Sequence, residues 1–339
     1  MISCPRCTAP CPDESNFCEE CGAALRQLTG VNSQGTQPVT IGAWSDLRSC
    51  SNCGAKIESA IEYCPQCGIA VGYPDTCEIA ELPDLVALSN HGLRHRKNED
   101  AVRVKRIGPR SFLALSDGVS HSQHPELAAQ RAASAALAVF VESPERAAED
   151  LLREAVARAQ AAVTEIAFDP NLVEDPACAT LTVALVSEKQ ITVAWLGDTR
   201  AYFISSEGAR LLTRDHSILN RMVSEAHIME SEALLLPGSH ALTRAVGGGA
   251  GALDPPDIAT YSINGPGLLL LCSDGLWNYV PEPAALHDLV RSQISIPPQS
   301  GSLLPLAQRL VEYACTQGGA DNISVALTTI VPTAEVSEN

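Results

Sequence analysis

Aromatic and basic residues are scarce in this sequence, and both shortages limit what the protein can bind. Only 4% of its 339 residues are Phe, Trp or Tyr, too few for a surface on which the bases of a single strand stack. Lys and Arg total 23 against 40 Asp and Glu, which gives a net charge of −17. This charge argues against non-specific nucleic-acid binding, which needs cations that displace phosphate counterions, and against attraction to an anionic membrane surface.

Long hydrophobic runs are also missing. No apolar run approaches the roughly 20 residues that span a bilayer, and the start of the chain lacks the basic and then apolar layout of a signal peptide. We therefore expect a soluble, cytoplasmic protein. Hydrophobic residues make up 45% of the chain, which is enough for the core of one large domain with smaller modules beside it.

Eight of the 13 cysteines form two sets with the same spacing, C-x2-C-x10-C-x2-C. The sets are Cys4, Cys7, Cys18, Cys21 and Cys50, Cys53, Cys64, Cys67. Four thiolates in tetrahedral array form a closed structural zinc site, so the repeat predicts two structural Zn²⁺ ions. Each unit is too short to have much core, and zinc binding would then supply its folding energy.

The cysteine pattern leaves other interpretations open. Disulfides would need an oxidising compartment, for which the sequence gives no sign, and an iron–sulfur cluster would also accept four thiolates. Cys11 lies inside the first set, although the matched spacing omits it. The pattern resembles the double zinc ribbon modules of bacterial signalling proteins, with ribbons at residues 1–28 and 47–72 and a linker at 29–46. Such modules serve nucleic-acid binding, docking, regulation or bracing, and the acidic composition argues against the first.

Four aspartates each stand beside one end of an apolar run that is typical of a buried strand: Asp117, Asp198, Asp274 and Asp321. A carboxylate at the dry end of a strand is costly unless it is paired or bound to a cation. If the four strand ends meet at one edge of a sheet, their carboxylates suit hard cations such as Mg²⁺ or Mn²⁺, and shared carboxylates suit a pair of ions. The alternative is that each Asp only closes a turn, which is favoured for one acid alone and disfavoured for all four together.

Strands and helices are expected between residues 84 and 332 in an order that does not alternate strictly. The expected strands cover 85–88, 112–115, 181–186, 191–196, 201–204, 268–271 and 323–330, and the expected helices cover 125–141, 144–166, 282–290 and 303–314. Clusters of strands followed by pairs of helices indicate an α+β layered domain.

Seven short motifs follow one another along this domain. They are Asn98-Glu99-Asp100, Ser116-Asp117-Gly118, Gly197-Asp198-Thr199-Arg200, Thr213-Arg214-Asp215-His216-Ser217, Leu242-Thr243-Arg244-Ala245-Val246-Gly247, Ser273-Asp274-Gly275-Leu276-Trp277 and Asp321-Asn322-Ile323-Ser324. In this order they resemble the metal-dependent serine/threonine protein phosphatases of type 2C, particularly the bacterial branch, over about residues 84 to 332. The resemblance implies a four-layer α-β-β-α sandwich with a metal site at one edge, so that the whole chain is α+β and begins with two small zinc ribbons.

The resemblance also implies a role for each acid. Asp117 would bridge two Mn²⁺ or Mg²⁺ ions, with the Gly118 carbonyl beside it. The other ligands and supports implied are Asp274 and Asp321 at the first ion, Glu99 at the second, Asp100 next to Glu99, and Asp198 at a third ion that bacterial members hold. Water between the two ions would lose a proton near neutral pH and attack phosphorus in line. The expected substrates are phosphoserine and phosphothreonine in proteins, opposite a serine/threonine kinase.

The residues expected to handle phosphate depart from the family pattern. Many members have an Arg that grips the substrate phosphate where this chain has His95, between Arg94 and Arg96. His95 could donate to the phosphate or the leaving group, or a neighbouring Arg could take over the grip. The third interpretation is that this basic run is only a solvated surface.

The loop after Gly118 departs further. The glycines usual in the family are replaced by Val119-Ser120-His121-Ser122-Gln123-His124. Val119 cannot donate a proton, so the general acid would be His121, His124, His95 or a metal-bound water. Because of these changes, a second function stays open, that of a pseudophosphatase scaffold that binds phosphoproteins or a kinase. A third, a nucleic-acid-binding ribbon protein with a regulatory phosphatase domain, is disfavoured by the net negative charge.

Residues 215–243 correspond to a flap that varies among family members and is a candidate for substrate selection. His216, His227 and His240 lie in or near it, and we expect them to be surface or capping residues because no metal-ligand spacing links them. Cys178 and Cys272 lie in or beside apolar runs and are expected to fill the core.

Overall fold

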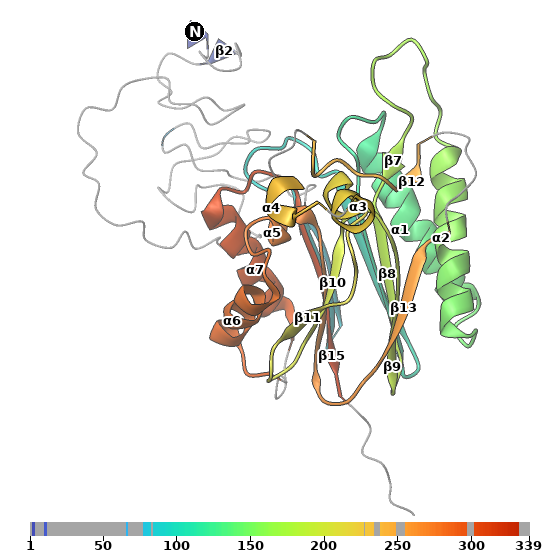
Figure 1. Cartoon of the computed structure of the whole chain (residues 1–339), viewed down its shortest axis with the longest axis vertical. Coiled ribbons are helices and arrows are strands. Elements are labelled where there is room, and N and C mark those ends of the chain that lie inside the picture. Colours follow the sequence, from blue (N-terminus) through green and yellow to red (C-terminus); the bar gives the residue numbers. More distant parts are fainter. Residues whose placement is uncertain are drawn as a thin grey trace, which may run out of the picture.

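Two antiparallel β-sheets packed face to face form the centre of the computed structural model (Figure 1). The structure describes residues 2–3, 10–11, 66, 77–82, 84–226, 228–233, 238–248, 255–296 and 302–331. One sheet has five strands in the order β13-β9-β8-β6-β5. Their bounds are β5 Asp100–Ile107, β6 Arg110–Asp117, β8 Leu181–Val186, β9 Gln190–Leu196 and β13 Asp257–Ser262.

The other sheet has six strands in the order β11-β10-β14-β15-β4-β3. Their bounds are β3 Cys77–Leu82, β4 Leu85–Asn90, β10 Arg200–Ile204, β11 Ala209–Leu211, β14 Gly267–Cys272 and β15 Ile323–Ile330. In β14, Leu268 and Leu270 pack with the helices while Leu269 and Leu271 pack between the sheets. Side chains of a strand alternate between its two faces, so this strand, covered on both sides, is apolar throughout.

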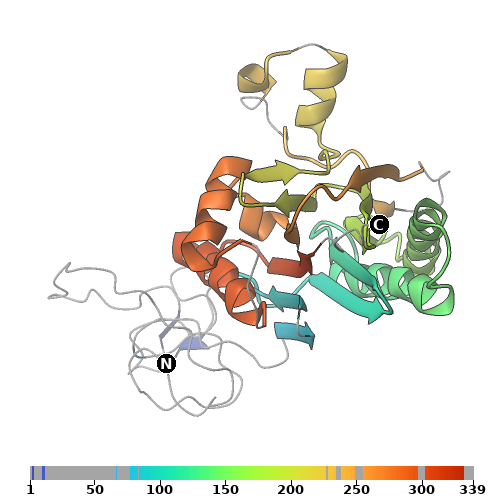
Figure 2. The same cartoon turned by 90° about the horizontal axis from the view of Figure 1, so that it is seen from below.

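Pairs of helices cover the outer faces of both sheets (Figures 1 and 2). The five-stranded sheet is covered by α1 Pro125–Glu142 and α2 Ala148–Thr164, and the six-stranded sheet by α6 Pro283–Gln293 and α7 Leu304–Gln317. The shorter elements are β7 Cys178–Ala179, α3 Ile218–Glu225, α4 Glu230–Ala233, β12 Val246–Gly247 and α5 Asp274–Trp277. The four-layer α-β-β-α sandwich is therefore confirmed.

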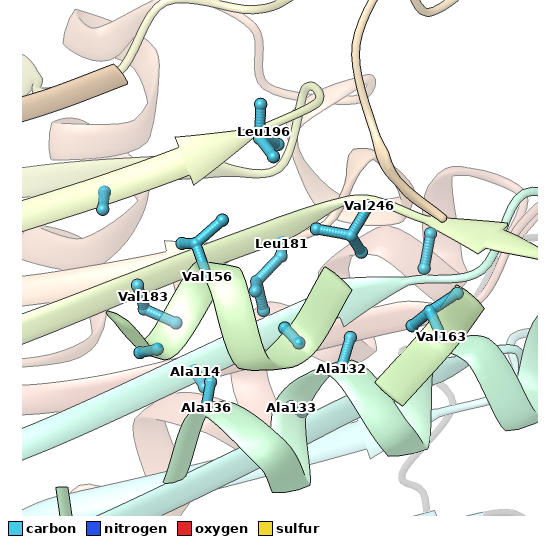
Figure 3. Close-up of a cluster of buried hydrophobic side chains, with 14 of the residues drawn as sticks. Ala114, Ala132, Ala133, Ala136, Val156, Val163, Leu181, Val183, Leu196 and Val246 are labelled. Atoms are coloured by element: carbon cyan, nitrogen blue, oxygen red, sulfur yellow. The ribbon is translucent and has the colours of Figure 1, made fainter. Parts of the chain in front are cut away.

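Small side chains connect α1 to the five-stranded sheet. Ala132, Ala133 and Ala136 are fully buried in one cluster with Ala114 of β6 (Figure 3). At the other end of the helix, the rings of Phe112 and Phe140 stack with their centroids 5.3 Å apart. Because alanine leaves little space between helix and sheet, α1 is held firmly, and its first residue, Pro125, lies close to the end of β6.

Helix α2 begins later than the sequence predicts. The expected start was residue 144, whereas the helix begins at Ala148. The Arg110 guanidinium donates hydrogen bonds to the carbonyls of Pro144 and Arg146. These carbonyls are thus bound by a side chain of β6 and not by helical N–H groups, and the segment forms a turn.

Four strands of the two large sheets, β3, β5, β11 and β13, have no counterpart in the sequence prediction. The alternation Val102-Arg103-Val104-Lys105 in β5 is the pattern of a strand with one buried face and was the signal that could have revealed it. Residues 215–243 include the helices α3 and α4. Cys272 is fully buried, as expected of a core residue, whereas Cys178 is only partly buried.

The eight cysteines predicted to bind zinc lie outside the described residues, and so does His227. Near the first set, β1 Ile2–Ser3 pairs antiparallel with β2 Pro10–Cys11. No helix in the described part of the chain is long and apolar enough to cross a membrane.

Candidate metal centre

The four strand-end aspartates lie at one end of the sandwich, two from each sheet. Asp117 is the last residue of β6 and Asp198 follows β9, and these two strands run in the same direction because each pairs antiparallel with β8. Asp274 follows β14 and Asp321 precedes β15, which pair antiparallel with Cys272 opposite Val325. The sandwich therefore collects acids that are distant in sequence at one edge.

These carboxyl groups are close enough to change one another's ionisation. Burial raises the pKa of Asp117 well above its usual value, and the charges of Asp100, Asp274, Asp198 and Asp321 raise it further. Burial, followed by the charge of Asp321, raises the pKa of Asp274 to about 6. Burial, followed by the charge of Asp274, raises the pKa of Asp198 to about 8. A nearby cation favours the ionised form of a carboxyl group, so a divalent ion would relieve this repulsion.

Asp100 provides a second reason to expect a cation. It stands directly opposite Asp117 in the β5–β6 ladder and is 3% exposed. Its carboxylate oxygens lie near the hydroxyl groups of Ser324 and Ser273 but form no hydrogen bond of regular geometry with them. Burial raises its pKa to about 7, although the hydroxyl groups of Ser324 and Ser273 act in the opposite direction. Like charges directly opposite each other in a sheet are destabilising, and a cation would remove that cost.

The burial and the negative charge of these carboxylates suit divalent ions, although the side chains do not form a closed coordination site. Among the described residues, no three His, Cys, Asp or Glu side chains already stand in the geometry of a closed metal site. The donors present are carboxylates and backbone carbonyls, the ligand set of Mg²⁺ and Mn²⁺. A group of mutually repelling carboxylates would draw together around such an ion.

Glycines at two of these turns allow backbones to meet. A Cβ on Gly118 would overlap the carbonyl oxygen of Pro125, and one on Gly275 would overlap that of Asn322. Gly118 also donates its N–H to the Glu99 carbonyl at 3.0 Å. Glycine therefore follows Asp117 and Asp274 because no side chain fits there, which gives the Asp-Gly pairs a reason beyond turn formation.

Asn322 ties the loop that carries Glu99 to the site. Its amide nitrogen donates to the carbonyls of His91 and Lys97, both at 3.0 Å, and its Oδ1 accepts the Glu99 N–H at 2.6 Å. The Glu99 carboxylate accepts a hydrogen bond from the Ser120 hydroxyl at 2.7 Å. Sequence reasoning assigned Asn322 no role, although its place in the Asp321-Asn322 motif was a signal.

His95 lies next to the acids. Its Nε2 is 3.3 Å from Oδ1 of Asp321. The other residues predicted to handle phosphate or protons have exposed side chains on the neighbouring loops: Arg94, Arg96, His121 and His124. The fold thus brings His95 against a predicted metal ligand.

The sequence predicts a surface or capping residue at His216, but the structure shows that this side chain is buried and does not lie on the surface. It is 9% exposed, its ring stacks on Trp195, and its Nδ1 accepts the N–H of Gly197 at 3.0 Å. The buried ring and the neighbouring Arg244 lower its pKa. It therefore holds the turn that leads to Asp198. The sequence alone could not show this positioning role, because it depends on contacts with Gly197 and Trp195 that only the fold brings about.

A buried ion pair supports the same turn. Arg200 donates two hydrogen bonds to the Asp215 carboxylate through Nε and Nη2, the shorter at 2.7 Å, and its guanidinium lies 3.9 Å from the centre of the Trp277 ring. Trp277 Nε1 in turn donates to the Asp198 carbonyl at 3.0 Å. These contacts link β10, α5 and the start of the 215–243 segment around Asp198.

Comparison with known proteins identifies the family. Residues 91–323, more than half of the chain, match the family described as Protein phosphatase 2C. The chain belongs to the protein phosphatase 2C family. Residues 4–68 match the family described as Double zinc ribbon, in agreement with the cysteine spacing.

Relatives of this phosphatase 2C chain include bacterial serine/threonine phosphatases. The serine/threonine phosphatase stp of Listeria welshimeri is 32% identical over 150 residues, which are 44% of this chain and 55% of the relative. The serine/threonine protein phosphatase PstP of Mycobacterium tuberculosis is 29% identical over 249 residues, 72% of this chain and 44% of the relative. The chain thus spans about half the length of the relatives it matches.

Solved structures share the phosphatase 2C fold. The structure of the serine/threonine phosphatase PstP/Ppp of Mycobacterium tuberculosis has a TM-score of 0.58 at 26% identity. The match covers 74% of this chain and 98% of the PstP/Ppp chain. The PstP catalytic domain in complex with 2 manganese ions has a TM-score of 0.56 at 25% identity, covering 74% of this chain and 100% of its own.

Proposed function

We propose that this protein is a metal-dependent phosphatase that hydrolyses phosphoserine and phosphothreonine in proteins. The observation that carries the proposal is the cluster of buried acids, which raise one another's pKa at the edge shared by both sheets. Membership of the phosphatase 2C family supports it, as do relatives named serine/threonine phosphatases and the neighbouring structure with manganese.

Two Mn²⁺ or Mg²⁺ ions would be held by residues of both sheets. In this proposal the residues that would hold these two ions are Asp117, the Gly118 carbonyl, Asp274, Asp321 and Glu99, with Asp100 as a neighbouring support, and Asp198 would hold a third ion. When bound, the ions supply a reactive water and neutralise phosphate oxygens. The chain's own part is to fix the carboxylates through Gly118 and Asn322, and to present cationic groups to the phosphate.

The candidates for the phosphate contact are His95, Arg94 and Arg96, all on the loop between β4 and β5. We assign His95 the central place among them because it contacts Asp321. His121, which is exposed on the loop after Gly118, is the candidate that would protonate the leaving oxygen.

We further propose that two zinc ribbons, at residues 1–28 and 47–72 with a linker at 29–46, dock partners of a phosphatase domain at residues 84–332. The partners would be phosphorylated proteins that a serine/threonine kinase modifies in a signalling system. Cysteines spaced as thiolate ligands, and not as a disulfide framework, favour a cytoplasmic location.

The test is phosphate release from p-nitrophenyl phosphate and from a phosphothreonine peptide in the presence of Mn²⁺. We expect EDTA and Asp274→Asn each to abolish release. EDTA removes the ions that would neutralise the phosphate oxygens, and Asp274→Asn removes a carboxylate that would hold one of them. Asp288→Asn, which changes an exposed acid on α6, is the matched control and should retain full activity. Equal turnover by Asp274→Asn would contradict the mechanism, whereas peptide binding without turnover in the unchanged protein would indicate a pseudophosphatase scaffold.

A further inference from the structure

The segment of residues 165–177, called here the 165–177 arm, exposes apolar side chains close together. It joins α2 to β7. Phe168, Leu172 and Val173 are 45%, 54% and 100% exposed. Single exposed apolar residues are normal on a protein surface, but three within six positions suggest a contact surface.

A turn places the two most exposed of these side chains at the outer part of the arm. The Asp169 carboxylate accepts hydrogen bonds from the backbone and the side chain of Asn171, at 2.9 and 2.8 Å, and the Asp169 carbonyl accepts the Leu172 N–H at 3.2 Å. The turn is therefore ordered by its own hydrogen bonds, while Leu172 is more than half exposed and Val173 is fully exposed.

The arm is fastened to the loop that follows the metal centre. Gln123, 6% exposed, donates its side-chain amide to the Asp169 carbonyl at 2.8 Å and accepts the Asp169 N–H at 2.9 Å. The main chain adds Gln123 N–H to the Asp175 carbonyl at 2.8 Å and Asp175 N–H to the His121 carbonyl at 3.1 Å. A loop held by several hydrogen bonds has already lost the entropy that ordering would cost on binding.

The same attachment reaches the predicted ligands directly. Val119 donates its N–H to the Cys178 carbonyl at 3.0 Å, and Thr180 donates its N–H to the Asp117 carbonyl at 2.7 Å. Gly118 forms a bridge with Ala179. Figure 1 shows the arm extending beyond β7 at the end of the sandwich where α3 and α4 lie. A polypeptide that reaches the acids from this side would pass the arm.

The charge of the arm indicates what kind of polypeptide it suits. Its charged residues are all acidic: Glu165, Asp169, Glu174 and Asp175. Between Arg158 and Lys189 the sequence contains no Lys or Arg. Basic side chains on a partner would find complementary charge here, and apolar ones would cover Leu172 and Val173.

We propose that the 165–177 arm is a docking surface for the phosphoprotein substrate and selects segments with basic and apolar residues near the phosphorylated residue. The proposal rests on the phosphatase function proposed above and adds a specificity determinant to it. Gln123 would then be a positioning residue that holds the arm against the loop after Gly118.

The experiment compares two kinds of substrate on the full chain. The variant Leu172→Ser/Val173→Ser should lower kcat/KM about tenfold for a phosphothreonine peptide flanked by Arg and Leu, because two buried apolar contacts are lost. Hydrolysis of p-nitrophenyl phosphate, which is too small to reach the arm, should not change. Val141→Ser is the matched control, since Val141 is 50% exposed and lies at the far end of α1, roughly 25 Å of helix away from Pro125.

Charge is tested separately with Glu174→Lys. This variant should lower kcat/KM for the basic peptide and raise it for a peptide in which Glu replaces each Arg. Equal losses on the peptide and on p-nitrophenyl phosphate, or no change on the peptide, would overturn the docking role.

A binding measurement separates failure of the docking proposal from failure of the proposed phosphatase function. If the unchanged protein hydrolyses neither substrate, binding of the fluorescently labelled basic peptide is measured by anisotropy. Binding that weakens about tenfold in the Leu172→Ser/Val173→Ser variant would still support the docking surface on an inactive scaffold. Absence of binding, or equal binding by both proteins, would refute it.

Discussion

At the scale of single residues, His216 shows how a side chain with no predicted role can order a site. Its Nδ1 accepts the N–H of Gly197, and the ring fills the space beside Trp195. We expect His216→Ala to lower the free energy of unfolding by about 1–3 kcal/mol, because a buried N–H loses its acceptor. Urea denaturation followed by fluorescence measures this loss.

His240 is the control for that prediction. It belongs to the same segment but is exposed, so His240→Ala should change the free energy of unfolding by no more than about 0.5 kcal/mol. If both substitutions had the same small effect, His216 would not have the positioning role that its contacts indicate.

The acids predict how stability depends on pH in metal-free protein. The folded pKa values of Asp274, Asp100 and Asp198 are raised to about 6, about 7 and about 8, whereas in the unfolded chain each aspartate titrates near pH 4. The folded state therefore binds more protons between these limits. The stability that these groups contribute is complete below about pH 4 and is lost as the pH rises through 6 to 8.

We accordingly expect the Tm of EDTA-treated protein to fall from about pH 5 to about pH 8. Mn²⁺ should raise the Tm more at the higher pH, because the acids are then ionised and bind it better. Scanning calorimetry with and without Mn²⁺ makes the measurement, and Asp198→Asn should reduce the slope. A Tm independent of pH would mean that the carboxyl groups do not interact as the structure shows.

At the scale of elements, β14 has glycines on both sides that differ in surroundings. A Cβ on Gly275 would overlap the Asn322 carbonyl, whereas one on Gly265 would meet nothing within 4 Å. We expect Gly275→Ala to destabilise the protein by about 3 kcal/mol or more, since two backbones must separate. Gly265→Ala should change stability by less than about 1 kcal/mol. Thermal or urea denaturation of the two variants decides, and equal stability would show that β14 and β15 are not held at this distance.

Elements with strong local patterns could be predicted from the sequence, and those that depend on partners could not. The apolar run of β14 predicts a buried strand and the alanines of α1 predict a helix, because the residue types within each segment are enough to indicate its structure and burial. The start of α2 could not be predicted, since it depends on Arg110, which is distant in sequence. The edge strand β3 has mixed polarity, and only pairing with β4 gives it a place.

The site divides in the same way. The strand-end acids could be found because four of them stand next to apolar runs, a combination that turn formation alone does not explain. Gln123 and Asn322 could not be assigned a role, because their amides act on backbone groups of segments that sequence does not place beside them. The altered loop after Gly118 is a further case, because the hydrogen bonds that hold it to the 165–177 arm join segments that are distant in sequence.

At the scale of the whole molecule, the zinc ribbons give a separate prediction. We expect about two zinc ions per chain by elemental analysis after metal-replete expression, one for each set of four thiolates. Cys4→Ser and Cys50→Ser should each remove one ion, while Cys11→Ser, which lies outside the matched spacing, should leave the zinc content unchanged. Zinc content near zero in the unchanged protein would contradict the ribbon assignment.

The predicted metal ligands are divided between the two sheets, so the proposed activity would require the assembled sandwich. Neither sheet alone carries the full set, so an intermediate with one sheet formed would turn over nothing. On the proposed phosphatase function, the return of activity during refolding would therefore report when the two sheets have packed together, without any added label.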